Sequence, residues 1–184
     1  HFGKEGVNYM YRNLGYWGMQ DYMAMAKWFI ANGNADPKKI AITGFSYGGY
    51  MSCYALTYGA SVFTHAMAGG SVTDWSLYDS HYTERFMDTP GENPEGYKSS
   101  SVLSFIKDFK GTLQLVHGTS DDNVHMQNSI QLLSALQDNG KEVEFMLYPG
   151  GRHGWGGAKG KHFTDLKNKF IFNHLLDKPY TPTK

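Results

Sequence analysis

A serine, an aspartate and a histidine stand in that order along the chain, each in a short loop whose residue types suit acyl transfer. Residues 44–48 read Gly-Phe-Ser-Tyr-Gly, which fits the nucleophile elbow, a sharp turn that lifts its serine above a sheet. We expect side chains at the two glycines to collide with this turn. Because a serine hydroxyl is a poor nucleophile at neutral pH, Ser46 would need a base that a third group orients.

The candidate base and acid lie in two later loops. Residues 118–123 (Gly-Thr-Ser-Asp-Asp-Asn) and residues 149–154 (Pro-Gly-Gly-Arg-His-Gly) each follow an apolar run. Of the eight histidines, His153 alone sits in a glycine-flanked loop after the last predicted strand. His117 ends a predicted strand and is expected to be packed rather than catalytic. The order serine, acid, histidine is that of an α/β-hydrolase triad.

Two adjacent carboxylates compete for the role of the acid. Asp122 is nearer to the following predicted helix and, like Asn123, can act as its N-cap. That leaves Asp121 as the partner of His153. The amide of Tyr47, the residue after the nucleophile, would stabilise the oxyanion that forms during acyl transfer. A second donor normally comes from an earlier loop, and no earlier loop here fits that role.

The pattern of apolar residues predicts the elements that would position these loops. Short apolar or β-branched runs typical of strands occupy residues 40–45, 65–68, 112–117 and 143–148. A helix is expected after Ser46, and apolar residues recur with helical spacing in residues 19–29, 126–136 and about 160–176. Such alternation implies a parallel sheet with helices on both faces. We therefore predict an α/β fold, the C-terminal portion of an α/β-hydrolase, with a parallel sheet of about four strands flanked by helices.

Two segments depart from this alternation. Residues 1–17 are rich in Gly, Tyr and Asn and are expected to be irregular. Residues 74–101 are aromatic-rich and partly helical in pattern, and would form a structured excursion over one end of the sheet. No repeat or linker divides the chain, so we expect one domain over residues 1–184.

The composition argues against several classes of function. The 184 residues carry 17 Lys and Arg against 17 Asp and Glu, so no basic surface is expected for nucleic acid. No apolar run approaches the roughly 20 residues of a membrane helix. No His-Glu-x-x-His pattern or cysteine pair suggests a metal site, and no cofactor is expected. The single cysteine, Cys53, is expected to be a small core residue.

Four motifs, in order along nearly the whole chain, are shared with a known family. Residues 44–50 read Gly-Phe-Ser-Tyr-Gly-Gly-Tyr, and residues 74–85 form an aromatic segment that begins Asp-Trp-Ser. Residues 117–125 form the candidate acid loop, and His153 is followed by a glycine. Together these motifs resemble the prolyl oligopeptidase family, and within it the dipeptidyl peptidase IV branch, which includes bacterial prolyl tripeptidyl peptidases. The resemblance implies that the first aspartate of the acid loop is the catalytic one.

The resemblance assigns further roles by position. Asn123 would donate a hydrogen bond to the carbonyl of the substrate residue before the one attacked. The attacked residue, typically proline in the family, would enter a pocket lined by Val72, Trp75, Tyr78, Tyr82 and Val124. A flat aromatic slot with few donors suits a compact ring that has no N–H.

The resemblance also implies a function: a serine exopeptidase that releases short peptides from the N-terminus of its substrates after Pro or Ala, in a periplasmic or secreted protein. Family members carry an N-terminal β-propeller, earlier hydrolase strands and an oxyanion-hole tyrosine, none of which is found in these residues. Three alternatives stay open: an acylaminoacyl peptidase or esterase with the same triad, a non-catalytic interaction domain, and a fragment that is inactive in isolation.

One strand edge bears on possible partners. No strand of comparable apolar character precedes residues 40–45, so one edge of that strand would be unpaired. A bare apolar edge is a template for association with another chain. Besides a peptide substrate, we therefore expect a homodimer or larger self-association, with residues 1–17 or the strand edge at the contact.

Overall fold

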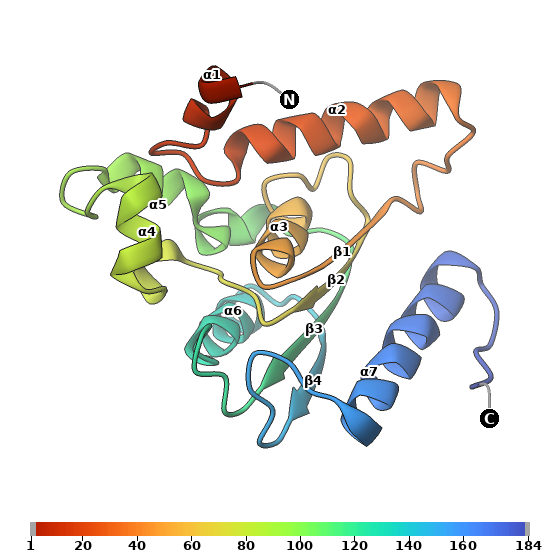
Figure 1. Cartoon of the computed structure of the whole chain (residues 1–184). Coiled ribbons are helices and arrows are strands. Elements are labelled where there is room, and N and C mark those ends of the chain that lie inside the picture. The colour runs from red at the N-terminus through yellow and green to blue at the C-terminus, as the bar shows by residue number, and fades with distance from the viewer. Residues whose placement is uncertain (1–2, 183–184) are drawn as a thin grey trace.

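A parallel sheet forms the centre of the computed structural model, which describes residues 3–182 (Figure 1). Its strands are β1 (Ala41–Phe45), β2 (His65–Gly69), β3 (Thr112–Gly118) and β4 (Glu144–Tyr148). They lie side by side in sequence order, and every neighbouring pair is parallel. The apolar runs therefore predicted all four strands to within one residue at each end, and the predicted α/β class is confirmed.

Helices cover both faces of the sheet, as the alternation of elements predicts. On one face lie α3 (Tyr47–Leu56) and α6 (Gln127–Asp138), and on the other lies α7 (Gly157–Phe170), which continues as the π-helix η3 (Ile171–Leu175) (Figure 1). Helix α3 is buried along almost its whole length and packs on β1 and β2. This central position fixes the segment that carries Ser46.

The strand register brings the candidate catalytic loops to one edge of the sheet. Phe45 at the end of β1 pairs with Gly69 of β2, and Gly69 pairs with Val116 near the end of β3. At the end of β4, Tyr148 pairs with Gly118. Because all four strands are parallel, the loops that follow them gather beyond their carboxyl ends, where α/β proteins place their sites.

The segment between β2 and β3 is the predicted structured excursion. It contains the 3-10 turn η1 (Trp75–Leu77), α4 (Ser80–Met87), α5 (Pro94–Ser100) and the largely 3-10 segment η2 (Val102–Asp108). Side chains fix both of its α-helices at the N-terminus: Asp79 accepts a hydrogen bond from the N–H of Tyr82, and Asn93 accepts one from the N–H of Gly96. The excursion is therefore a defined structure and not a flexible loop.

The N-terminal segment is more regular than the sequence suggests. Within residues 1–17, predicted to be irregular, α1 (Gly3–Asn8) forms one short helix and α2 (Tyr16–Asn32) begins. Residues 1–2 lie outside the described residues. The side chain of Tyr11 donates a hydrogen bond to Asp88 (2.6 Å), and Arg12 forms an ion pair with the same carboxylate (3.1 Å). These contacts tie the N-terminal segment to the excursion, a long-range link that composition alone does not reveal.

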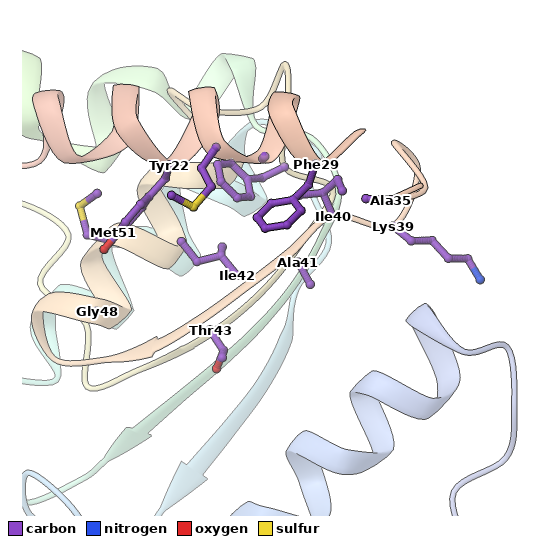
Figure 2. A pocket seen from close by; sticks show the side chains of 13 residues that line it. Tyr22, Phe29, Ala35, Lys39, Ile40, Ala41, Ile42, Thr43, Gly48 and Met51 are labelled. Atoms are coloured by element: carbon purple, nitrogen blue, oxygen red, sulfur yellow. The ribbon is translucent and has the colours of Figure 1, made fainter. Parts of the chain in front are cut away.

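Helix α2 lies beside the free edge of β1 and leaves a groove between them (Figure 2). The groove has a volume of about 520 Å³ and is mostly apolar. Tyr22 and Phe29 of α2 line this groove together with Ile42 of β1, yet the two aromatic residues stay 49% and 47% exposed (Figure 2). Only Met19 on this helix is buried. The apolar stripe that predicts α2 therefore faces an open groove instead of a closed core.

Between residues 3 and 182, no helix is both long enough and apolar enough to cross a bilayer.

Candidate active site

Ser46 occupies a strained turn between β1 and α3. Its backbone has φ 60° and ψ −120°, a conformation that costs a residue with a side chain about 1–3 kcal/mol. The N–H of Ser46 donates a hydrogen bond to the carbonyl of Gly69 at the end of β2 (2.8 Å). The sheet thus holds the serine in an unfavourable conformation, and such strain is characteristic of a nucleophile elbow.

The glycines around Ser46 have different roles. A side chain at Gly44 would come within 2.3 Å of the backbone of Gly48, so the turn requires glycine there, as predicted. The expectation is wrong for Gly48, where an added methyl group would meet no atom within 4 Å beyond its chain neighbours and its own helix backbone. Gly49 is the second constrained position, because a side chain there would lie 2.5 Å from the carbonyl of Gly69. That glycine permits the close approach of α3 to β2.

Asp121 is buried and its carboxylate is held from two sides. Oδ1 accepts hydrogen bonds from the N–H groups of Asn123 (3.0 Å) and Val124 (2.9 Å). Oδ2 accepts one from Nδ1 of His153 (2.8 Å). Only 1% of the aspartate side chain is exposed. Backbone N–H groups thus fix one carboxylate oxygen and leave the other to orient the histidine.

Asp122 has surroundings quite unlike those of its neighbour. Its side chain is 67% exposed and lies 3.6 Å from the guanidinium of Arg152. The prediction that Asp122 or Asn123 caps the following helix is wrong, because α6 begins only at Gln127 and its N-cap position is Met126. The intervening residues are occupied by the turn that Asp121 closes with its own carboxylate.

The ring of His153 lies over the ends of β1 and β2. It packs edge-on against Phe45 with 5.2 Å between ring centroids, and its side chain is 21% exposed. Because Nδ1 donates to the Asp121 carboxylate, the neutral ring presents Nε2 as the proton acceptor. Between residues 3 and 182, no hydrogen bond joins the Ser46 hydroxyl to this ring. In unliganded sites such a bond is often long and shortens only with substrate.

Tyr47 is the first residue of α3, where backbone N–H groups have no partner within the helix. The N-cap residue, Ser46, makes no capping hydrogen bond with its side chain. The N-terminus of a helix also carries the positive end of its dipole. The amide of Tyr47 therefore lies where it can stabilise negative charge beside Ser46. Burial raises the pKa of the Tyr47 side chain to about 12, so the phenol stays neutral.

Aromatic residues of the excursion form one cluster beside the elbow. Trp75 is 1% exposed, stacks on Tyr82 with 6.0 Å between ring centroids, and lies 5.8 Å from the ring of Tyr47. Tyr78 contacts both Trp75 and Tyr82 edge-on. Burial raises the pKa of Tyr82 and Tyr78, which keeps both phenols neutral near pH 7. The structure thus brings together the aromatic residues that the sequence predicts for the pocket.

The remaining predicted pocket residues lie next to this cluster. Val72 (2% exposed) and Val124 (0%) belong to the same buried apolar core as Trp75. The hydroxyl of Tyr78 donates a hydrogen bond to Oδ1 of Asn123 (2.7 Å), which leaves the amide NH₂ of Asn123 available as a donor.

One residue of the site was not predicted as functional. His117 is packed, as expected, and fully buried, but its Nε2 also lies 3.4 Å from Oδ2 of Asp121. The sequence offers one signal for this contact, the four-residue spacing between the two side chains. A four-residue spacing predicts contact between side chains only within a helix, and here it joins a strand end to a loop.

Known proteins similar to this chain share one family. The prolyl oligopeptidase family matches residues 1–178 of the chain. Prolyl endopeptidase FAP from Homo sapiens is 41% identical over 165 residues, which cover 88% of this chain and 22% of that protein. Dipeptidyl peptidase 4 from Felis catus is 43% identical over 146 residues, covering 78% of this chain and 19% of that protein. In the crystal structure of Porphyromonas gingivalis dipeptidyl peptidase 4, the match has a TM-score of 0.88 and 38% identity over 91% of this chain and 24% of that one.

The chain therefore spans about a fifth of the length of the curated relatives that it matches. The similarity to the solved structure shows that the sheet and its helices are part of an α/β-hydrolase fold, as predicted. Since the family match covers nearly every residue, the chain belongs to the prolyl oligopeptidase family.

Proposed function

We propose that this chain is the C-terminal part of the catalytic domain of a serine peptidase, in which Ser46 is the nucleophile, His153 the base and Asp121 the acid. The observation that carries the proposal is the hydrogen bond between His153 Nδ1 and Asp121 Oδ2 (2.8 Å), next to an elbow whose serine has a positive φ. An acyl-transfer site needs a strained serine, a histidine and a buried carboxylate that orients the ring, in this arrangement.

The proposed reaction follows from these groups. His153 Nε2 takes the proton of the Ser46 hydroxyl as Ser46 Oγ attacks the substrate carbonyl, and Asp121 stabilises the imidazolium that results. The oxyanion would accept a hydrogen bond from the N–H of Tyr47. The imidazolium then protonates the leaving amine as the C–N bond breaks, which leaves an acyl-enzyme. Water, deprotonated by the same histidine, hydrolyses that ester and regenerates Ser46.

Cleavage after Pro or Ala is the specificity we propose. Tyr78 and Tyr82 are only partly buried and would offer flat apolar faces to a compact side chain, while Trp75, Val72 and Val124 form the buried apolar core behind them. Asn123, whose amide oxygen is already bonded to Tyr78, would use its NH₂ group to hold the carbonyl of the preceding substrate residue. The proposal that short peptides are released from the N-terminus is supported by the similarity to dipeptidyl peptidase 4 and not by these contacts.

A pair of chromogenic substrates tests this specificity on the protein as its gene encodes it. We expect hydrolysis of a Gly-Pro substrate with a free amino group to exceed that of an acetyl-alanyl substrate. The reverse order would favour an acylaminoacyl peptidase with the same triad. Failure of Ser46 to react with a fluorophosphonate would contradict the peptidase proposal itself.

We further propose that the chain associates with itself, as a homodimer or larger assembly, through the groove between α2 and β1. The free edge of β1 carries unpaired backbone groups, and the groove beside it is apolar. Exposed apolar surfaces of this kind mark interaction sites. Light scattering over micromolar concentrations tests the proposal, and a stable monomer throughout would contradict it.

A further inference from the structure

His117, at the end of β3, is a buried polar residue that the proposed reaction does not use. Its side chain is fully buried and makes two short hydrogen-bond contacts. Nε2 lies 2.8 Å from the carbonyl oxygen of Val124, and Nδ1 lies 2.7 Å from the hydroxyl of Ser129 on α6. A buried imidazole with a partner on each nitrogen is held rigidly, so it also fixes the positions of the groups that it contacts.

These partners determine which ring nitrogen carries the proton. A carbonyl oxygen can only accept, so Nε2 of His117 must be the N–H that donates to Val124. Nδ1 then accepts the hydrogen bond from the Ser129 hydroxyl. Burial lowers the pKa of His117, an effect that the Val124 carbonyl and Asp121 oppose and His153 reinforces. Asp121 and His153 are the titratable groups that face it, and the ring is neutral at pH 7.

Val124 connects this histidine to the proposed catalytic carboxylate. The carbonyl of Val124 accepts from His117, while the N–H of the same residue donates to Oδ1 of Asp121 (2.9 Å). The N–H of His117 also faces Oδ2 of Asp121 at 3.4 Å, too long for a strong hydrogen bond but favourable for a negative oxygen. Movement of Val124 would therefore shift the oxygen pair that orients His153.

We propose that His117 is a positioning residue, which anchors Val124 from the end of β3 and thereby keeps Oδ2 of Asp121 in place for His153. The inference rests on the proposed triad and extends it by one residue. His117 itself is fully buried, but Val124 is also a proposed pocket residue, so the role is tested by a readout of Ser46 that does not depend on substrate binding.

Two amide substitutions separate this role from ordinary packing. The side-chain NH₂ of glutamine reaches about as far as Nε2 of histidine, whereas that of asparagine reaches only about as far as Nδ1. His117→Gln therefore keeps a donor for the Val124 carbonyl, and His117→Asn loses it. The probe is the rate at which a fluorophosphonate labels Ser46, since this rate reports the nucleophile and does not require peptide binding. The experiment uses the protein as its gene encodes it, with thermal unfolding measured for each variant.

We expect H117N to be labelled about 10- to 100-fold more slowly than wild type, the cost of a misplaced catalytic group, and H117Q to stay within about threefold. For a peptide substrate, kcat should fall in H117N by a larger factor than KM rises, because Val124 also belongs to the proposed pocket. Gln114→Met is the matched control: Gln114 is a buried polar residue on the same strand, outside the site, and its loss should affect stability alone.

Equal labelling rates for folded H117N and H117Q would overturn the inference, whether both match wild type or both are slow. That outcome leaves the proposed function standing as long as wild type is labelled and Ser46→Ala is not. If wild type is not labelled at Ser46, the proposed function fails instead. The two failures are therefore distinguishable in one experiment.

Discussion

Two regions of the molecule differ in how completely their side chains find partners. One is the pair of loops beyond β3 and β4, and the other is the layer formed by α1 and α2. In the loops, the buried Asp121 accepts three hydrogen bonds, and His117 has a partner on each nitrogen. In the N-terminal layer, apolar side chains face solvent. Of the large apolar side chains that are exposed in the described residues, all but Ile130, Leu147 and Leu176 lie within residues 7–29.

This difference separates the proposed chemistry from stability and assembly. The proposed chemistry depends on short-range hydrogen bonds within residues 117–153, all of which the chain itself provides. Stability and assembly depend also on the groove beside β1, whose apolar lining the chain leaves open. Substitutions in the first region should change rates without changing assembly, and substitutions in the second should do the reverse.

The largest expected effect is that of Ser46→Ala on turnover. Loss of the hydroxyl removes the only covalent nucleophile, so kcat should fall about 10⁴-fold or more while substrate still binds. Ser120→Ala, an exposed serine in the acid loop, is the matched control and should keep wild-type activity. Steady-state kinetics on the protein as its gene encodes it provide the test. Activity above about a hundredth of wild type in S46A would refute the assignment.

The second effect distinguishes the two adjacent aspartates. Asp121→Asn replaces the acceptor of the His153 N–H by a group that can donate, so kcat should fall about 10⁴-fold. Asp122→Asn removes only an exposed contact with Arg152 and should change the free energy of unfolding by about 0.5 kcal/mol or less. Kinetics and urea unfolding of both variants check this. The reverse ranking would mean that the acid is misassigned.

The sequence predicts those parts of the fold that depend on local pattern. The four strands follow from short apolar runs, and the elbow from glycines whose side chains would clash, as at Gly44. The turn after β3 differs from the prediction, because Asp121 closes it with its own carboxylate and α6 begins only at Gln127. An acidic residue before a helix has the same appearance in sequence whether it caps the helix or turns the chain.

Contacts between distant segments could not be predicted in the same way. The link between His117 and the Val124 carbonyl depends on how the loop folds back over the strand end, which no periodicity encodes. Helix α1 was missed for a different reason: it is only six residues long and carries none of the apolar periodicity that predicts α2. Its position is set by the contacts that Tyr11 and Arg12 make with Asp88.

A charge placed in the groove tests the N-terminal layer. Ala26 on α2 lines the groove, so Ala26→Glu would place a carboxylate in an apolar contact and should weaken self-association about 10- to 100-fold. Ala24→Glu, on an exposed position of the same helix outside the groove, is the control and should leave association unchanged. Sedimentation equilibrium measures both. Equal association of the two variants would show that the groove is not the contact, and fluorophosphonate labelling should be normal in each.

The smallest expected effect is a dependence of stability on pH that belongs to the sheet and the site and not to the N-terminal layer, whose residues 3–33 include no histidine. Burial lowers the pKa of His117 and of His65 in the folded protein, while the unfolded chain titrates near about 6.5. As the pH falls below about 7, the unfolded state therefore binds more protons at these histidines than the folded state does. Stability should be full above that range and decline toward pH 5, with a slope of at most about 1.4 kcal/mol per pH unit for His117 and a smaller one for His65, which solvent screens.

Urea unfolding between pH 5 and 8 measures this decline in the free energy of unfolding. The substitution His117→Gln should remove the part of the decline that His117 contributes. The difference between the wild-type and H117Q curves isolates the contribution of His117, because Asp121 and His153, the titratable groups that face it, are present in both proteins. Gln114→Met should lower the whole curve and keep its slope. If H117Q and wild type decline with equal slopes, burial of a neutral His117 makes no contribution to acid destabilisation.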